Sequence, residues 1–352
     1  MLKILFIDSS NDGHHIPYLK GIVDSQKKFT SFFILPKGKY NLPGHVFEYK
    51  ESGSEFNLIS YLTWLKFIKK IYKKINPDII CFLYGDVFYK RFGIGLKCFS
   101  KNCRVIIIFH QFRERPFIRN SLKRIFRHIE VGIVHTRYNL KELINIGIKN
   151  VQQIEYPQLY PYKSLDINEA REKLGLPKER IILAAMGATS YYKGLDILLE
   201  ALTLSKGKFD LLIAGKLTDF NKDFINKYNS KIKGNIYILN GPLSDEDFHL
   251  AISASNLIVL PYRKVFDGAS GPLIEAVWAD KPVIGSDSKS LGELIKREKI
   301  GLTFKSEDSI NLSNVIDESI HCYSKFSNGI NQYKTKISKI NFQQEFFNLF
   351  IK

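Results

Sequence analysis

Pro261-Tyr-Arg-Lys-Val-Phe-Asp-Gly-Ala-Ser-Gly-Pro-Leu-Ile-Glu-Ala-Val-Trp-Ala-Asp-Lys-Pro-Val-Ile-Gly285 is the most informative segment of this 352-residue chain. The apolar run at 257–260, just before it, predicts a buried parallel strand. A Gly-rich loop follows, then a helix entered through Pro272, and then a second strand at 283–284. This order of strand, loop, helix and strand is typical of a βαβ unit.

Two carboxylates flank the start of the predicted helix. Asp267 lies in the loop and Glu275 about one turn into the helix, with the spacing D-x7-E. The unpaired N–H groups of a helix N-terminus suit a phosphate, and a carboxylate can accept hydrogen bonds from two adjacent ribose hydroxyls. The pattern therefore fits a nucleotide-sugar. The alternative is that Asp267 caps a turn and Glu275 is a solvated helix residue.

Strands and helices alternate along the chain in two blocks. Strands are predicted at 2–7, 31–35, 78–83, 104–109, 131–135 and 151–155, and then at 180–186, 209–214, 235–239, 256–260 and 282–285. Helices of the second block are predicted at 194–205, 219–231, 244–253 and 272–279. The two prolines within 156–161 indicate a linker. We therefore predict an α/β protein with two Rossmann-like domains, 1–160 and 161–335, and a C-terminal helix in 336–352 that packs back across the domain junction.

Composition limits the class of protein. No apolar run approaches the roughly 18 residues of a membrane span, and the four cysteines show no C-x-x-C spacing, as expected of reduced thiols in a cytosolic protein. The net charge of +17 attracts anions. Segments 62–75 and 112–128 combine Lys or Arg with apolar residues at helical spacing, which favours contact with an anionic membrane surface. The alternative is a solvated helix face.

The D-x7-E segment resembles the E-x7-E region of GT-B glycosyltransferases, particularly glycosyltransferase family four. Further motifs of the second block resemble the same family in order. Segment 186–201, which begins Met186-Gly-Ala-Thr-Ser-Tyr-Tyr-Lys-Gly194, resembles the donor loop, and Leu212-Ile-Ala-Gly215 and Leu239-Asn-Gly-Pro242 resemble the next strand ends. The resemblance is much weaker in the first block. It implies two facing Rossmann-like domains with parallel sheets and an active site in the cleft between them.

The resemblance also implies roles for individual residues. Lys193 would contact the donor diphosphate, Glu275 would hold the ribose hydroxyls, and Asp267 would act at the transferred sugar as a catalytic residue. The backbone N–H groups of Gly271 and Leu273 would face the phosphate. Further donor-binding residues are expected at Ser270, Gly187, Arg263 and Gly241.

The segment departs from the family pattern at two points. The first carboxylate is Asp267 where the family usually has Glu, so it reaches less far. The Arg that normally accompanies the lysine is missing from 187–192, and Arg263 or Lys264 would substitute for it.

In the first block, the loop Asp8-Ser-Ser-Asn-Asp-Gly-His-His15 follows the first strand, where an open α/β sheet places a ligand loop. It resembles the family's flexible loop at which donor and acceptor meet, formed here by Gly13, His14 and His15. The two histidines could equally be residues of a helix start. His110 ends a predicted strand, and the resemblance implies that it lines the sugar site as a catalytic residue. The alternative is a structural histidine.

The resemblance implies a retaining glycosyltransferase that uses a nucleoside-diphosphate-sugar and needs neither metal nor cofactor. We expect a glycan or lipid-linked acceptor in the synthesis of bacterial surface polysaccharide, such as capsule, O-antigen of lipopolysaccharide or exopolysaccharide. The protein would then be cytoplasmic and peripheral at the inner face of the cell membrane. A nucleotide-sugar epimerase on the same fold, which needs no acceptor, is the alternative. A nucleic-acid-binding protein is a remote one, because no RNA- or DNA-binding motif accompanies the positive charge.

Overall fold

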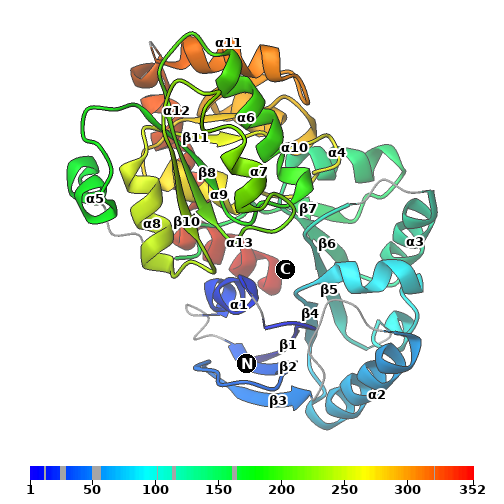
Figure 1. Ribbon diagram of the computed structural model, residues 1–352. Coiled ribbons are helices and arrows are strands. Elements are labelled where there is room, and N and C mark those ends of the chain that lie inside the picture. Colours follow the sequence, from blue (N-terminus) through cyan, green and yellow to red (C-terminus); the bar gives the residue numbers. More distant parts are fainter. Residues whose placement is uncertain are drawn as a thin grey trace. The chain divides into compact units, whose positions relative to one another are not determined.

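The computed structural model describes residues 1–11, 13–23, 29–49, 57–100, 102–112, 116–160, 165–320 and 322–352. The chain folds into two compact units, drawn in Figure 1. The first unit contains Met1–Leu159 together with Ser338–Lys352, and the second contains Tyr160–Ile337. Parts of the predicted loop 8–15, of the linker 156–161 and of the basic segment 112–128 lie outside the described residues.

The described part of the first unit contains a seven-stranded parallel sheet in the order β3-β2-β1-β4-β5-β6-β7. Its strands are β1 (Leu2–Ile7), β2 (Phe29–Pro36), β3 (His45–Tyr49), β4 (Ile79–Phe82), β5 (Arg104–Phe109), β6 (Val131–Val134) and β7 (Val151–Gln153). The sequence did not predict β3, because only one residue of this edge strand is buried and it lacks the buried apolar run of its neighbours.

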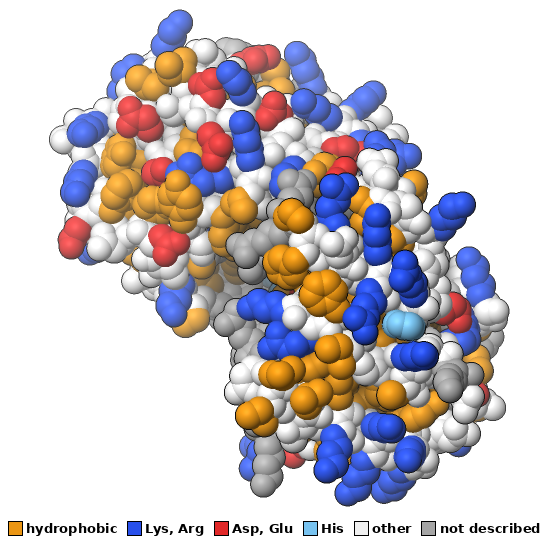
Figure 2. Space-filling view, turned by 90° about the vertical axis from the view of Figure 1, so that its right-hand side faces the viewer, with side chains coloured by type: hydrophobic (Ala, Val, Ile, Leu, Met, Phe, Trp, Pro, Cys, Tyr) orange, Lys and Arg blue, Asp and Glu red, His pale blue; other side chains and the backbone are white. Residues whose placement is uncertain are grey.

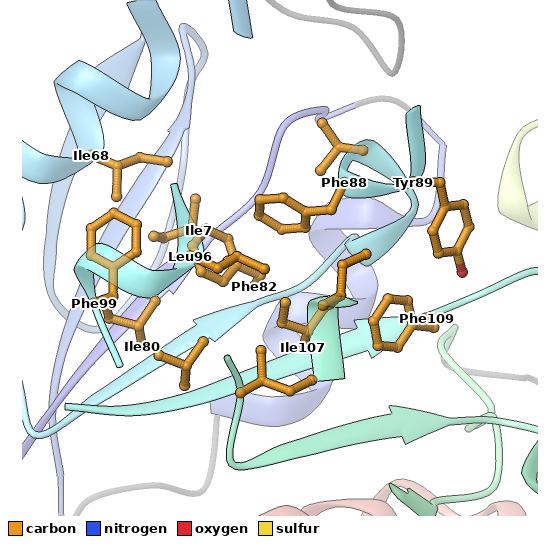
Figure 3. Close-up of a cluster of buried hydrophobic side chains, with 14 of the residues drawn as sticks. Ile7, Ile68, Ile80, Phe82, Phe88, Tyr89, Leu96, Phe99, Ile107 and Phe109 are labelled. Atoms are coloured by element: carbon orange, nitrogen blue, oxygen red, sulfur yellow. The ribbon is translucent and has the colours of Figure 1, made fainter. Parts of the chain in front are cut away.

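Helices cover both faces of this sheet. They are α1 (His15–Val23), α2 (Leu58–Ile75), α3 (Pro116–Phe126), α4 (Arg137–Asn145) and α13 (Lys339–Ile351), with the short 3-10 helices η1 (Gly85–Arg91) and η2 (Leu96–Cys98). Figure 3 shows one face, where Ile7, Ile80 and Phe82 of the strands meet Ile68 of α2 and Phe88 of η1. These side chains are almost fully removed from water, and their burial stabilises the unit.

The other face of the sheet is covered by α1 and by the C-terminal helix α13. The rings of Phe6 and Phe350 lie edge to face with 5.9 Å between centroids, and Phe342 and Phe346 are also buried. Arg104 donates to the last carbonyls of α13, at 2.7 Å to the oxygen of Phe350 and 3.0 Å to that of Leu349. The arginine therefore satisfies helix-terminal acceptors and holds α13 against the first unit.

The apolar stripe of the 62–75 segment lies mostly in the core of the first unit. Leu65, Ile68 and Ile71 of α2 are buried in the core of the first unit, whereas Leu62, from the same predicted stripe, is 48% exposed. The stripe is buried because it covers one face of the sheet, as an amphipathic helix of a globular domain does. The lysines between these positions point to solvent.

The described part of the second unit contains a six-stranded parallel sheet in the order β10-β9-β8-β11-β12-β13. Its strands are β8 (Ile182–Met186), β9 (Asp210–Gly215), β10 (Ile236–Asn240), β11 (Leu257–Leu260), β12 (Val283–Ser286) and β13 (Gly301–Phe304). Its helices are α5 (Ile167–Leu174), η3 (Tyr191–Lys193), α6 (Leu195–Leu204), α7 (Lys222–Asn226), α8 (Asp245–Ala254), α9 (Gly271–Trp278), α10 (Lys289–Glu298), α11 (Ser309–Ser319), η4 (Tyr323–Phe326) and α12 (Ser327–Ile337).

The helix predicted at 219–231 is shorter in the structure. Asn221 caps α7 by accepting from the backbone N–H of Phe224 at 2.9 Å, and the helix ends at Asn226. Turns follow, in a segment that contains Asn229 and Ser230. Asn and Ser compete with the helical backbone for hydrogen bonds, so they favour turns over helix continuation.

The strand order of each sheet reverses once. In the first unit the reversal lies between β1 and β4, and in the second between β8 and β11. Chains that leave such neighbouring strands turn to opposite sides and leave room for a ligand beside the carboxyl ends of the strands. Each unit therefore has one favoured position for a binding site.

Candidate active site

The candidate donor site lies at the reversal point of the second unit. β8 and β11 are hydrogen-bonded neighbours, and the loops that follow them, 187–194 and 261–270, leave the same edge of the sheet. The loops are joined where Arg263 donates its backbone N–H to the carbonyl oxygen of Tyr192 at 2.8 Å. Gly194, with φ of +67°, passes so near Pro261 that a Cβ would lie 2.1 Å from the proline carbonyl oxygen. The two loops thus form one surface.

Lys193 folds back over the end of β8. Its Nζ lies 3.3 Å from the carbonyl oxygen of Met186 and 5.9 Å from the ring centroid of Tyr262. Gly187, with φ of +89°, allows this approach, because a Cβ there would lie 2.5 Å from Nζ. Burial lowers the pKa of Lys193 to about 8, so the side chain is mostly an ammonium at neutral pH. It is a partly desolvated cation, suited to an anionic ligand.

Both carboxylates of the D-x7-E pattern are buried. Asp267 is 4% exposed and Glu275 5% exposed, so the alternative that Glu275 is a solvated helix residue is wrong. Nε2 of His249, in α8, lies 3.2 Å from Oε2 of Glu275. The loop that carries Asp267 is fixed by Ser290, whose hydroxyl donates to the carbonyl oxygen of Gly268 at 2.9 Å. Buried carboxylates on fixed backbone have the rigidity that a binding site needs.

The helix that carries Glu275, α9, begins at Gly271, one residue before the expected start. Ser270 is its N-cap, and the Ser270 hydroxyl accepts the backbone N–H of Leu273 at 3.3 Å. The backbone N–H of Leu273, which was expected to face a phosphate, is therefore already hydrogen-bonded to the Ser270 hydroxyl. The Tyr262 hydroxyl lies 3.2 Å from the same Ser270 oxygen. No described atom comes within 4 Å of a Cβ added at Gly271, so the helix start has open space beside it.

Two further expected donor-binding residues lie at the same edge of the sheet. Gly241 follows β10 with φ of +141°, and its backbone N–H donates to Gly215 at 3.4 Å. Arg263 stacks on the ring of Tyr191 at 4.0 Å and pairs with Asp196 at 2.5 Å. Because Asp196 already neutralises it, Arg263 braces the donor loop in this structure, and Lys264 beside it is exposed.

The corresponding edge of the first unit contains an Asp–His pair. Asp8, directly after β1, is 3% exposed, and its carboxylate accepts the backbone N–H of Ser10 at 3.2 Å. Nδ1 of His15 lies 3.0 Å from the same carboxylate. Gly13, with φ of +56°, turns the chain between them, and His15 begins α1. Asp8 therefore shapes the loop that the sequence indicated.

Histidine and tyrosine rings gather around this loop. The ring of Tyr84, two residues after β4, lies 5.0 Å from the ring of His15 and 5.3 Å from that of His110, measured between centroids. His14 is 5.8 Å from His110, so the structure brings together the three histidines expected to act here. His135 joins them, 5.1 Å from His110. We call His14, His15, Tyr84, His110 and His135 the histidine cluster.

The buried histidines of this cluster are uncharged at neutral pH. Burial, and then the neighbouring His135 and His14, hold the pKa of His110 well below its usual range. Its Nε2 lies 2.9 Å from the carbonyl oxygen of Leu83, so that nitrogen carries the proton. Burial also lowers the pKa of His135 to about 4, and both ring nitrogens of His135 have partners, Tyr18 and Ile154. His135 thus has a structural role.

Sequence reasoning missed three side chains of these two sites. Tyr84 and Tyr262 each follow a predicted buried strand at a reversal point, so their position behind the strand was the available signal. His249 had no such signal, because 26 residues separate it from Glu275. Among the described residues, no group of three or more His, Cys, Asp or Glu could hold a metal ion. No helix in the described ranges is long and apolar enough to cross a membrane.

The two parallel-sheet, Rossmann-like units match the GT-B fold of glycosyltransferase structures. Residues 166–336 match the family model described as Glycosyl transferases group 1. The matched residues cover most of the second unit, including Lys193, Asp267 and Glu275. The family match and the fold together support a glycosyltransferase. No curated protein matches the chain.

Several solved structures are similar over the whole chain. Sucrose-phosphate synthase from Thermosynechococcus elongatus has a TM-score of 0.75 at 15% identity, covering 99% of this chain and 98% of that one. A glycosyltransferase from Rickettsia africae has a TM-score of 0.73 at 19% identity, covering 99% of this chain and 97% of that one. Anabaena Alr3699/HepE in complex with UDP has 0.73 at 17%, covering 99% of both chains. At these identities the likeness shows the fold.

Proposed function

We propose that the protein is a retaining glycosyltransferase of the family-four kind, which transfers a hexosyl group from a nucleoside-diphosphate-sugar to an acceptor hydroxyl. One observation carries the proposal. A half-buried lysine, a capped helix start and two buried carboxylates converge on the reversal point of the sheet that the family model matches. This is where a parallel α/β sheet binds ligands, and the groups are those that a diphosphate and sugar hydroxyls require.

The reaction breaks the bond between the anomeric carbon and the diphosphate oxygen and forms a bond to the acceptor oxygen, whose proton passes to the leaving diphosphate. Negative charge grows on the leaving diphosphate, and Lys193 with the N-terminus of α9 would stabilise it. The anomeric centre becomes oxocarbenium-like, and the Asp267 carboxylate would stabilise that positive charge. Glu275 would hold the ribose. With these groups the chain would need no metal or cofactor.

The histidine cluster of the first unit would bind the acceptor. Its buried rings are neutral, and aromatic faces with N–H and O–H groups suit the ring and hydroxyls of a sugar better than they suit a phosphate. We therefore propose a glycan or a lipid-linked sugar as acceptor, in the synthesis of a bacterial surface polysaccharide such as capsule, O-antigen of lipopolysaccharide or exopolysaccharide.

A lipid-linked acceptor would bring the protein to the inner face of the cell membrane. The exposed face of α2 offers Leu58, Ile59 and Leu62, which are 56%, 78% and 48% exposed, ahead of a row of exposed lysines. Figure 2 views the side on which α2 and α3 lie in Figure 1, and Lys and Arg side chains alternate there with apolar ones. Such a surface suits peripheral binding to anionic lipid. Co-sedimentation with anionic vesicles at low salt tests it, and Leu58→Ser with Ile59→Ser should halve the bound fraction or more.

The donor is identified by thermal shift with UDP, GDP, ADP, CMP and their sugar conjugates. A ligand that binds only the folded protein raises the melting temperature, by an amount that follows its affinity. We expect one nucleotide to stabilise the wild type but not Lys193→Ala or Glu275→Ala. Lys227→Ala and Glu200→Ala are matched controls, because both are exposed residues of the same unit outside the site. Absence of any shift in folded protein would overturn the proposal, and conversion of the donor sugar without acceptor would indicate an epimerase.

A further inference from the structure

His249 and Glu275 form a buried pair between two helices of the second unit. Nε2 of His249, in the middle of α8, lies 3.2 Å from Oε2 of Glu275, in α9. The two residues are 6% and 5% exposed. A buried carboxylate is costly unless it is hydrogen-bonded, so this contact fixes the side chain of Glu275 as well as compensating its burial.

The helices that carry the pair are themselves held in place. Ser244 caps α8 by accepting from the backbone N–H of Asp247 at 3.1 Å. Near the other end of α8, Ser253 donates to the carbonyl oxygen of His249 at 2.8 Å. Lys281, just after α9, donates to the carbonyl oxygen of Ser253 at 3.0 Å. The imidazole therefore meets the carboxylate from a backbone with little freedom to move.

We propose that His249 is a positioning residue that aims the Glu275 carboxylate at the 2′- and 3′-hydroxyls of the donor ribose, and so makes the site select ribonucleotides over deoxyribonucleotides. The proposal rests on the proposed function, because it assumes that Glu275 faces a nucleotide. The inference goes beyond the proposed function because it assigns the selection of ribose over deoxyribose to His249, which is remote from Glu275 in sequence.

The chemistry of the pair allows this role. An ionised carboxylate has about four lone-pair sites, and the His249 N–H occupies one of them. A carboxylate can therefore accept the two adjacent donors of a ribose diol as well as an imidazole N–H. The bond also opposes rotation of the carboxylate about its terminal torsion, which is otherwise broad. A site built to hydrogen-bond a hydroxyl rejects an analogue without it, since its buried acceptor is then left unsatisfied.

Titration calorimetry of the intact protein tests the proposal with UDP, GDP and ADP, their 2′-deoxy counterparts, and inorganic pyrophosphate. The wild type should prefer the bound ribonucleotide by roughly tenfold to a hundredfold, as for a hydrogen bond to a charged group. His249→Asn, whose amide falls short of Glu275, should reduce this preference to less than about threefold. His249→Gln, whose amide can replace the Nε2–H donor, should keep it. Pyrophosphate affinity should stay within about twofold in both variants, because neither touches the phosphate site.

Two further variants separate positioning from packing. Ser253→Ala removes another buried hydrogen bond of α8 without removing a donor to Glu275, and it should keep the preference. Glu275→Gln should lose it, and adding His249→Asn should change nothing more, because both act through one carboxylate. The inference is overturned, and the proposed function is left standing, if His249→Asn keeps the wild-type preference. The same holds if the wild type binds the ribonucleotide and its 2′-deoxy counterpart equally. A wild type that binds neither nucleotide nor pyrophosphate overturns the proposed function, and this inference with it.

Discussion

The reversal points of the two sheets have the same geometry and opposite chemistry. In the first unit, a loop held by Asp8 follows β1 and Tyr84 follows β4, and the imidazoles of His14, His110 and His135, whose pKa values burial lowers, lie around them. In the second unit, β8 and β11 end in loops that carry Lys193 and Asp267, and a capped helix starts beside them. One fold thus provides a site rich in neutral aromatic rings and an anion site, and the difference lies in the residues behind the strands.

This contrast assigns each half of a transfer reaction to the unit whose chemistry fits it. A diphosphate donor requires cations and N–H groups, which the second unit supplies. A sugar acceptor is uncharged and hydroxyl-rich, and the rings of the first unit suit it. If the assignment is right, variants of one unit change the kinetics of one substrate and leave the other substrate unaffected.

The largest effect is expected from Lys193→Ala. Loss of the ammonium leaves the developing diphosphate charge unopposed, so kcat/KM should fall by roughly a hundredfold to a thousandfold. Nucleotide affinity should fall with it, as measured by calorimetry, while the melting temperature of the free protein stays equal or rises, because a desolvated charge is removed. Lys227→Ala, at an exposed position, is the control and should behave as the wild type. If Lys193→Ala bound the nucleotide as tightly as the wild type, Lys193 would not form an anion site and the contrast between the two units would fail.

The converse variant is His110→Ala in the first unit. The His110 ring lies among His14, Tyr84 and His135, and its removal leaves a gap in the cluster. We expect KM for the acceptor to rise, or kcat to fall, by roughly tenfold to a hundredfold, as for loss of a positioning contact. The Kd of the nucleotide should stay within about twofold, since the comparison assigns the nucleotide to the second unit. An equal loss of nucleotide affinity would mean that the histidine cluster serves the donor.

The sequence predicts the second site much better than the first. Asp267 and Glu275 lie in one compact pattern of strand, loop and helix, and Lys193 lies in a second recognisable motif behind β8, the neighbour of β11 in the sheet. The histidine cluster instead draws on β1, β4, β5 and β6, whose neighbours are set by sheet order. Its members are far apart in the chain, so His110 and His15 could be placed only by resemblance. His249 was missed for the same reason, because it is far from Glu275 in the chain.

The 62–75 segment shows the other limit of sequence analysis. Its 3.6-residue period correctly predicts a helix with one apolar face, found as α2. The period does not reveal whether the sheet of the same unit or a membrane covers that face. The structure answers the question with Leu65, Ile68 and Ile71 in the core.

Two glycines with the same backbone angle give a matched test of the donor loop. Gly187 and Gly147 both have φ of +89°, but a Cβ at Gly187 would lie 2.5 Å from Nζ of Lys193, whereas no described atom lies within 4 Å of one at Gly147. Alanine at either position should cost about 1–2 kcal/mol of unfolding free energy, from the left-handed backbone. Only Gly187→Ala should also weaken nucleotide binding, by roughly tenfold, because it displaces the lysine. Equal nucleotide affinities in the two variants would show that the close approach has no role in binding.

The smallest effect concerns pH and separates the two units by their ionisation. Burial lowers the pKa of Lys193 to about 8, so its ammonium loses the proton as the pH rises through 8. Nucleotide affinity should therefore fall by up to about tenfold between pH 7.5 and 9. A diphosphate stabilises the ammonium, so the midpoint in the complex should lie higher than in the free protein. Stability of the free protein should change in the opposite sense, since the unfolded lysine holds its proton more tightly and folding is penalised below pH 8.

Lys193→Arg is the control for this pH dependence, because a guanidinium stays charged throughout the range. Its nucleotide affinity should be nearly constant between pH 7.5 and 9, even if it is lower than that of the wild type. The buried histidines of the first unit make a contrasting expectation. With the pKa of His135 at about 4 and that of His110 also well below its usual range, neither changes charge between pH 7.5 and 9, so KM for the acceptor should be flat where donor affinity falls. A parallel change in both parameters would mean that one ionisation controls both substrates, and the assignment of one substrate to each unit would fail.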